Sequence, residues 1–391
     1  DRFLKSKWYK IGHYSSKYAA IVILVVLIIA IPVSINVANL NTTLDLNQIY
    51  PRSSESRQAF IELEKDFPAG ELMPHYLIIQ TGTPNGLLNS SFFTYSQEII
   101  QSICDQTNMS STNIQGITWA DGMAIPFPLA ISYLSPESPY YNTNMGFLYR
   151  LIFNRYTNAD NSTALFEIDT EIDPFGNKIE DWVKVVRQIL ASFEQKTGYK
   201  LYIAGGSTEM IDSINRIYEL FPMMIVITII IIYVLIAFMF RSFFIPLRLI
   251  LTIALTLSWI YGLAVLLFEY DFFDPVFPAL QEVNSLYWIV PIMSFSILIG
   301  LGLDYDIFLL SRISEYRDLG FNDRASILRG LYKTGGIITA AGIIMAISFS
   351  GLLLSTEMVM NQFGFMLCVA VLIDTFIIRT ILVLSLIHIS E

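Results

Sequence analysis

The chain has 391 residues, of which 54% are hydrophobic and only 15% charged, and its 27 Phe and 21 Tyr make it rich in aromatic side chains. This composition is typical of a membrane protein and not of a soluble one, and nothing in a formal net charge of −10 suggests a nucleic-acid partner. Two cysteines are too few for a disulfide scaffold.

Six charge-poor segments are each long enough, at about 20 residues, to cross ~30 Å of hydrocarbon as a helix. We therefore predict a polytopic α-helical membrane protein with a basic arm at 1–17, a polar domain at 38–220 and membrane helices at 18–37, 221–240, 249–268, 286–310, 335–356 and 362–383. The first helix is not a cleavable signal peptide, because its apolar core is too long and no cleavage pattern follows it.

The polar domain is predicted to be α+β. Strand-like runs alternate with stretches of helical spacing, with strands at 74–80, 164–170 and 200–204 and helices at 92–103 and 179–193. Strands interleaved with two helices favour a ferredoxin-like, split βαβ unit inserted after the first membrane helix. Residues 121–150 contain four prolines and are predicted to be irregular. Residues 207–220 are predicted to form an amphipathic helix that runs straight into the second membrane helix.

Lys and Arg collect in three short segments, at 1–17, 241–248 and 312–333, whereas the loop at 269–282 has acids and no basic residue. By the positive-inside rule the N-terminus and the two basic loops are cytoplasmic, and the polar domain is extracytoplasmic. Four N-x-S/T sequons fall in this domain, at Asn41, Asn89, Asn108 and Asn161. Two interpretations of the sequons are equally open. If they are glycosylation acceptors, the protein lies in a eukaryotic plasma membrane or endomembrane. If they are chance matches, a bacterial inner membrane is possible as well.

The fourth predicted membrane helix contains the tripeptide Asp304-Tyr305-Asp306. A carboxylate inside a bilayer costs at least about 2.5 kcal/mol, so an intramembrane acid is a functional site by default. Asp304 precedes the basic boundary at Arg312 by about 12 Å of helix, too far for its short side chain to reach water. We predict that Asp304 binds a proton reversibly and that the Tyr305 hydroxyl donates to its charged form or passes the proton on.

Structural roles for the acids compete with this relay: a hydrogen bond of Asp304 with Thr339 or Ser348, an ion pair of Asp306 with Arg312, and an ion pair of Asp374 with Arg379. Asp306 lies about 200° around the helix from Asp304, so the two acids cannot share one face. For Asp306 and Asp374 we favour the structural role, and for Asp304 the proton relay.

Gly300 and Gly302 allow a neighbouring helix to approach closely, and Gly335, Gly336 and Gly342 on the next membrane helix are predicted to be that neighbour. The sequence has no nucleotide-binding loop, metal-ligand spacing or catalytic nucleophile motif. We therefore expect no cofactor, no metal and no enzyme activity. A proton gradient is then the energy source.

Four segments resemble the signature of MMPL-type transporters: GLGLDYDIFLLSRI at 300–313, RSFFIPLR at 241–248, TGGIITAA at 334–341 and LIDTFIIR at 372–379. These transporters belong to the resistance-nodulation-division (RND) superfamily, together with Patched-like and sterol-sensing proteins. The resemblance implies an RND half-unit that exports lipids or other hydrophobic molecules, driven by protons through an Asp-Tyr relay that Asp304 and Tyr305 match. The implied partners are this substrate, protons and membrane lipids.

Such transporters normally contain two copies of the unit, and this chain has one, most similar to the C-terminal half. The resemblance therefore implies a missing second six-helix half or a second protomer. Residues 384–391 depart from the family and are predicted to be a non-native tail, so we expect a fragment of a longer protein. A sterol-sensing receptor or lipid sensor without active transport is the alternative, and a structural subunit is a further one. The sensing branch usually has paired acids in place of Asp-Tyr.

Overall fold

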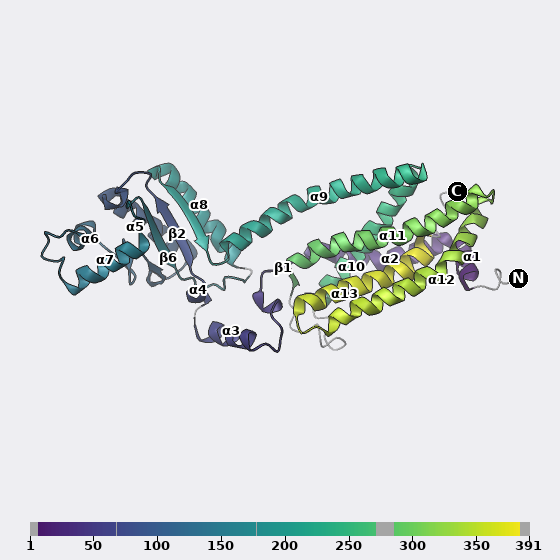
Figure 1. Ribbon diagram of the computed structural model, residues 1–391, viewed down its shortest axis with the longest axis horizontal. Helices are drawn as coiled ribbons and strands as arrows, with labels where there is room; N and C mark the ends of the chain where they lie inside the picture. The colour runs from purple at the N-terminus through teal and green to yellow at the C-terminus, as the bar shows by residue number, and fades with distance from the viewer. Residues whose placement is uncertain (1–6, 68, 177, 271–284, 384–391) are drawn as a thin grey trace. The chain divides into compact units, whose positions relative to one another are not determined.

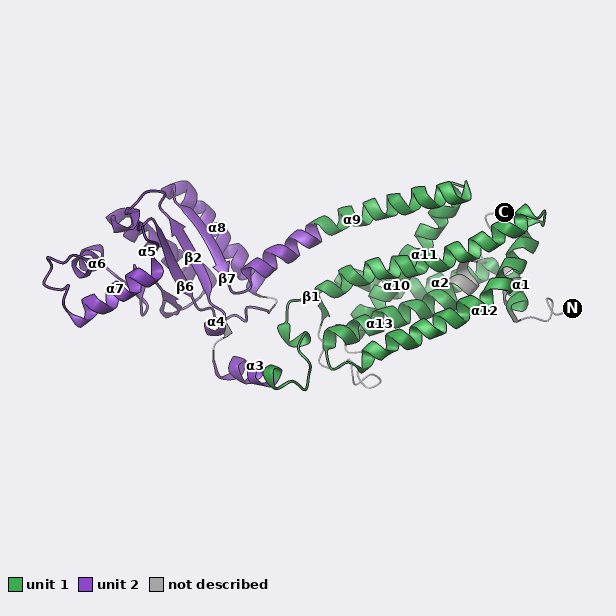
Figure 2. Cartoon of the chain, viewed as in Figure 1, with its two compact units in different colours: residues 1–57, 220–391 green, residues 58–219 purple. Residues whose placement is uncertain are grey.

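The computed structural model describes residues 7–67, 69–176, 178–270 and 285–383 (Figure 1). The chain divides into two compact units, residues 1–57 with 220–391 and residues 58–219 (Figure 2). The predicted tail at 384–391 and most of the predicted outer loop at 269–282 lie outside the described residues.

The first unit is a helical bundle, and six helices among the described residues are long and apolar enough to cross a membrane. They are α2 (Ala19–Ser34), extended by a 3-10 turn at Ile35–Asn39, α9 (Thr208–Phe240), α10 (Phe244–Phe268), α11 (Ile289–Asp318), α12 (Asp323–Ser350) and α13 (Met358–Ile373), which continues as a π-helix over Asp374–Val383. Each coincides with one predicted membrane helix. The chain is therefore an integral, multi-pass membrane protein.

The polar ends of these helices extend beyond the predicted spans. α12 begins at Asp323 and not at 335, with the Asn322 side chain accepting a hydrogen bond from the Ala325 amide at 2.9 Å as its N-cap. A further helix, α1 (Lys7–Lys17), occupies the basic arm. Hydropathy cannot detect such segments because they are rich in charge.

Close packing of the bundle depends on only some of the predicted glycines, and these contact other partners than predicted. A Cβ atom at Gly262 of α10 would lie 2.0 Å from the Val33 carbonyl oxygen of α2, so only glycine permits this crossing. On α11, a Cβ at Gly300 would meet nothing within 4 Å, and one at Gly302 would meet only Ile253 of α10. The predicted contact of these two glycines with α12 is therefore wrong. The predicted partners on α12 have other neighbours: Trp8 for Gly335 and Gly336, and Thr375 for Gly342.

Buried amides tie the segment after α2 to the start of α13. The short strand β1 (Thr42–Thr43) pairs in parallel with β8 (Leu286–Tyr287). The fully buried Gln362 donates to Gln48 Oε1 at 2.9 Å and accepts from the Tyr287 amide at 2.9 Å. Arg52 donates to Asn361 Oδ1 at 2.7 Å. These hydrogen bonds attach the segment that follows α2 to α13, the helix that leads to Asp374.

The second unit contains a four-stranded sheet in which every neighbouring pair is antiparallel, in the order β3-β6-β2-β7. Its strands are β2 (His75–Gln80), β3 (Ile114–Gln115), β6 (Thr163–Ile168) and β7 (Lys200–Gly205). Helix α5 (Ser90–Thr107) lies in the connection from β2 to β3, which crosses over the intervening strand β6. Helix α8 (Ile179–Thr197) lies in the connection from β6 to β7, which crosses over the intervening strand β2. Alternate residues of β2 and β6 are buried, which is the pattern of a sheet with one covered face.

The segment predicted to be irregular, 121–150, contains two helices, α6 (Phe127–Leu134) and α7 (Asn144–Tyr156), after a hairpin of β4 (Trp119–Ala120) and β5 (Met123–Ala124). The prediction was wrong because two of its prolines begin a helix. Pro126 is the N-cap of α6 and Pro128 lies in its first turn, where a backbone N–H is not needed.

The predicted continuous helix from the polar domain into the membrane is confirmed. Gly205, the last residue of β7, and Gly206 adopt φ angles of +77° and +57°, and α9 then runs without interruption for 33 residues. Positive φ angles favour glycine, which has no Cβ to clash. Pro222 lies inside α9 near the start of its apolar part.

Candidate functional site

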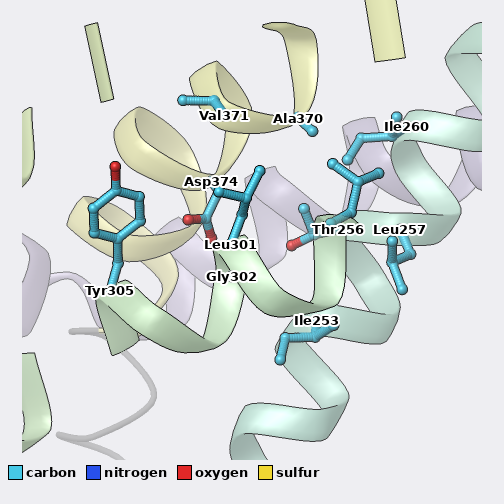
Figure 3. Close-up of a pocket in the computed structure, with 11 residues that line it drawn as sticks. Ile253, Thr256, Leu257, Ile260, Leu301, Gly302, Tyr305, Ala370, Val371 and Asp374 are labelled. Atoms are coloured by element: carbon cyan, nitrogen blue, oxygen red, sulfur yellow. The ribbon is translucent and has the colours of Figure 1, made fainter. Parts of the chain in front are cut away.

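A cavity of about 20 Å³ lies inside the bundle between α10, α11 and the end of α13, which is room for one water molecule. Apolar side chains form most of its wall, and Figure 3 shows them with the polar side chains of Thr256, Tyr305 and Asp374. Thr256 donates its hydroxyl to the Thr252 carbonyl at 2.9 Å, within its own helix. Tyr305 and Asp374 are therefore the groups at this cavity that can exchange a proton.

Tyr305 reaches the cavity from α11 and Asp374 from the junction of α13 with the π-helix (Figure 3). The Tyr305 hydroxyl lies 3.4 Å from Met345 Sδ of α12, and a thioether is a weak acceptor. Gly302, one turn before Tyr305, also lines the cavity, where the absence of a side chain leaves space. A phenol and a carboxylate that line one water-sized space can pass a proton through a water molecule held there.

Asp304 is exposed on α11 and does not line this cavity. The predicted packing hydrogen bond is not formed. Ser348 donates to the Ile344 carbonyl at 2.9 Å, and Thr339 Oγ1 has no hydrogen-bond partner among the described residues. The structure thus separates Asp304 from Tyr305, which follows it by about 100° around the helix.

Asp306 is only 2% exposed and lies within electrostatic range of Arg248 on α10. Arg312 instead forms its ion pair with Glu315, one turn further along α11. The predicted pair of Asp306 with Arg312 is therefore wrong, because six residues place the two side chains about 240° apart around the helix. Asp306 belongs to the interior of the bundle and not to its edge.

Asp374 stands where α13 changes into a π-helix, a form often found at functional sites. Its neighbour Thr375 is fully buried, and its Oγ1 would lie 2.4 Å from a Cβ added to Gly342 of α12. The side chain of Arg379, the predicted ion-pair partner, lies outside the described residues. Sequence reasoning therefore missed that Asp374 and Tyr305 share a cavity. Both were visible as polar residues in apolar segments.

Three of the sequon asparagines, Asn41, Asn89 and Asn108, are exposed. Asn161 is half-buried, and its amide donates to Asn85 Oδ1 at 3.1 Å. Glycosylation of the four sites stays a prediction.

Residues 48–390 match the MMPL family, so the chain belongs to this family. The resemblance of its four segments is thereby confirmed.

The chain is similar to the acyltrehalose exporter MmpL10 of Mycobacterium tuberculosis, with 31% identity over 238 residues that cover 60% of this chain and 23% of that protein. It is 28% identical to the sulfolipid-1 exporter MmpL8 of the same species over 231 residues, 58% of this chain and 20% of that protein. It is 31% identical to the membrane protein YdfJ of Bacillus subtilis over 232 residues, 58% of this chain and 31% of that protein. The matched part is less than a third of each relative.

Proposed function

We propose that the chain is one six-helix unit of a proton-driven exporter of lipids or other hydrophobic molecules. Membership of the MMPL family supports this proposal, as do the names of two relatives, which are exporters of acyltrehalose and of sulfolipid-1. The observation that carries it is the cavity of about 20 Å³ that Tyr305 and Asp374 share inside the bundle. A lipid channel needs no such site, whereas a pump needs an acid that titrates away from bulk water.

In this proposal the relay has two parts. Tyr305 and Asp374 exchange a proton within the chain, and Asp304 acts at an interface. Asp304 is exposed on the surface of α11, where contact with hydrocarbon would be costly for a carboxylate. This face therefore needs a protein partner, which we propose is a second six-helix half or a second protomer. Asp304 would then gain and lose its proton between the two halves.

We further propose that the second unit is a ferredoxin-like domain outside the cytoplasm. Its antiparallel order β3-β6-β2-β7 and its two helical crossovers support this assignment. Arg241 lies in the turn between α9 and α10, and Arg317 and Arg324 lie on the helix ends that flank the turn between α11 and α12. These basic residues support a cytoplasmic location for both turns and for the N-terminus.

Helix α9 is the proposed mechanical link of the cycle. In the bundle it contacts α11 at both ends of its apolar part, through Phe221 and Phe295, whose ring centroids lie 5.3 Å apart, and through the buried cluster of Ile236 and Leu310. Protonation of Asp304 removes a charge from α11, so this helix repacks against the partner half and shifts α9. Because α9 is continuous over 33 residues, or about 50 Å, the shift reaches the second unit.

The proposal is tested by Asp304→Asn in the complete transporter, reconstituted in liposomes with an imposed pH gradient. General acid–base groups contribute about 10²- to 10⁴-fold, so we expect lipid export to fall at least about 100-fold in Asp304→Asn. In Tyr305→Phe and in Asp374→Asn the export rate should fall by about tenfold or more. The loss is smaller because a water molecule can partly replace the missing group. Asp318→Asn, at the end of the same helix, is the matched control and should export at the wild-type rate.

Gel filtration must show that each variant is assembled. Wild-type, gradient-dependent export by Asp304→Asn would refute the relay, and an equal loss in Asp318→Asn would assign the effect to charge alone.

A further inference from the structure

A second, larger cavity of about 790 Å³ opens at the end of the bundle where α9 turns into α10 and α11 into α12. The turn after α9, the first turns of α10 and α12 and the last turns of α11 line it. Its size is that of a small-molecule pocket. The candidate relay does not use it.

The polar rim of this cavity is basic. Arg241, Arg248 and Arg317 line it together with a single acid, Asp323, so the lining carries a net charge of +2. Asp323 already accepts from Arg317, with Nε 3.2 Å from its Oδ1. Arg241 lies in the turn between α9 and α10 with a left-handed backbone conformation, at a φ angle of +49°. An anion is therefore the ligand that this rim favours.

Arg248 has N–H donors that form no hydrogen bond with the described residues. Its Nε and Nη2 atoms are buried and have no hydrogen-bond partner among the described residues. Asp306 is near enough to influence the charge of Arg248. Buried donors normally find a partner, and the planar guanidinium matches the two oxygens of a phosphate.

The floor and the outer margin of the cavity are apolar. Phe240, Ile245 and Leu310 form the floor and belong to the packed cluster between α9, α10 and α11. At the margin, Phe244 is 83% exposed and the adjacent Phe243 is 77% exposed. Exposed aromatic rings beside arginines are typical of the level of the lipid headgroups. A ligand here thus has an anionic group among arginines and a hydrophobic part along the phenylalanines.

We propose that this cavity binds the phosphate headgroup of an anionic phospholipid from the cytoplasmic leaflet, as a resident lipid and not as cargo. Arg248 and Arg241 hold the phosphate oxygens, Arg317 completes the positive rim, and the acyl chains lie along Phe243 and Phe244. Basic pockets between membrane helices on the cytoplasmic side bind such headgroups. The site rests on the proposed orientation of the bundle but not on the proton relay.

Native mass spectrometry of the purified full chain, titrated with dioleoylphosphatidylglycerol or dioleoylphosphatidylcholine, tests the proposal. We expect one tightly bound phosphatidylglycerol per chain and affinity for phosphatidylcholine at least about tenfold lower. A charge-assisted hydrogen bond is worth enough for about a tenfold change in affinity, so Arg248→Gln and the double variant R241Q/R317Q should each weaken phosphatidylglycerol binding by about tenfold or more. The exposed Arg241 and Arg317 keep the test valid if Arg248→Gln fails to fold.

Arg324→Gln is the matched control, because it removes the same charge from an exposed position at the same end of the bundle that does not line the cavity. It should bind like the wild type. Wild-type binding by R241Q/R317Q, or an equal loss in Arg324→Gln, would overturn the proposal. Displacement of the lipid by inorganic phosphate at equal concentration would assign the site to a soluble anion and overturn the lipid assignment.

Discussion

His75 is a fully buried imidazole at the start of β2, where its ring centroid lies 4.9 Å from that of Trp182. Neither ring nitrogen has a hydrogen-bond partner among the described residues. Burial lowers the pKa of His75 from 6.5 to about 4, and the opposing attraction of Glu209 is smaller. The folded protein therefore holds His75 neutral, so this residue makes the stability of the second unit sensitive to acid.

The direction of this effect follows from the two pKa values. Below pH 6.5 the unfolded chain binds a proton at His75, but the folded chain does so only near pH 4. The free energy of unfolding should therefore fall by about 3 kcal/mol as the pH drops from 6.5 to 4, and this residue should contribute no change at higher pH. Urea unfolding of the full chain and of His75→Leu at pH 7.5, 5.5 and 4.5 measures it.

Each pH gives a difference in unfolding free energy between wild type and His75→Leu, and this difference should move in favour of the variant as the pH falls. Burial raises the pKa of Asp169 to about 6. Because Asp169 is present in both proteins, its contribution cancels in the difference between their unfolding free energies. A difference that stays constant from pH 7.5 to 4.5 would contradict the prediction.

The acids of α11 show which part of the site the sequence could predict. Polar side chains in an apolar segment are visible in the sequence, so Asp304, Tyr305 and Asp374 could be named as candidates from the sequence alone. Which face of α11 meets the bundle was not visible, because apolar side chains lie on every side of the part of this helix that precedes Asp304. Two residues of separation rotate a side chain by about 200°, so Asp306 is buried while Asp304 is exposed. The shared cavity also depends on a contact between α11 and α13, which no local pattern encodes.

At the scale of whole elements, the crossing of α2 and α10 depends on a glycine. Because a Cβ at Gly262 would lie 2.0 Å from a backbone oxygen of α2, Gly262→Ala must push the two helices apart. Overpacking of this kind costs about 1–3 kcal/mol. We expect Gly262→Ala to lower the thermal unfolding temperature of the purified chain in detergent.

Gly300→Ala is the matched control, since its Cβ would meet nothing within 4 Å in this chain. It should unfold at the wild-type temperature or slightly above it, because alanine favours the helix. Equal unfolding temperatures for Gly262→Ala and the wild type would show that α2 does not pack against α10 as closely as the structure indicates.

The elements themselves were largely predictable. Membrane helices need about 20 apolar residues, so hydropathy located all six. Three strands of the second unit, β2, β6 and β7, were located to within one or two residues by β-branched and aromatic runs. The two-residue strands β3, β4 and β5 were not predicted. The predicted elements are wrong where one sequence feature is compatible with two structures. Prolines break helices but also begin them, as in α6, and charged turns such as the start of α12 resemble loops when only hydropathy is considered.

At the scale of the whole molecule, the chain consists of two units with separate cores. The core of residues 58–219 is built from the sheet and its two crossover helices, with large side chains such as Leu77, Ile100 and Phe166 fully buried. None of these side chains belongs to a helix that could span a membrane. The second unit should therefore fold without the bundle.

Cys104 reports on this folding because it is the single cysteine of the unit. It lies in α5, is 6% exposed, and has a thiol pKa raised mainly by burial. In a purified fragment of residues 58–219, Cys104 should react with a thiol reagent at least about 100-fold more slowly in buffer than in 6 M guanidinium, because labelling then requires unfolding. The full chain with Cys368→Ser is the control, and its protection should be the same. Rapid labelling of the fragment together with slow labelling of the full chain would show that the bundle is needed to hold the second unit together.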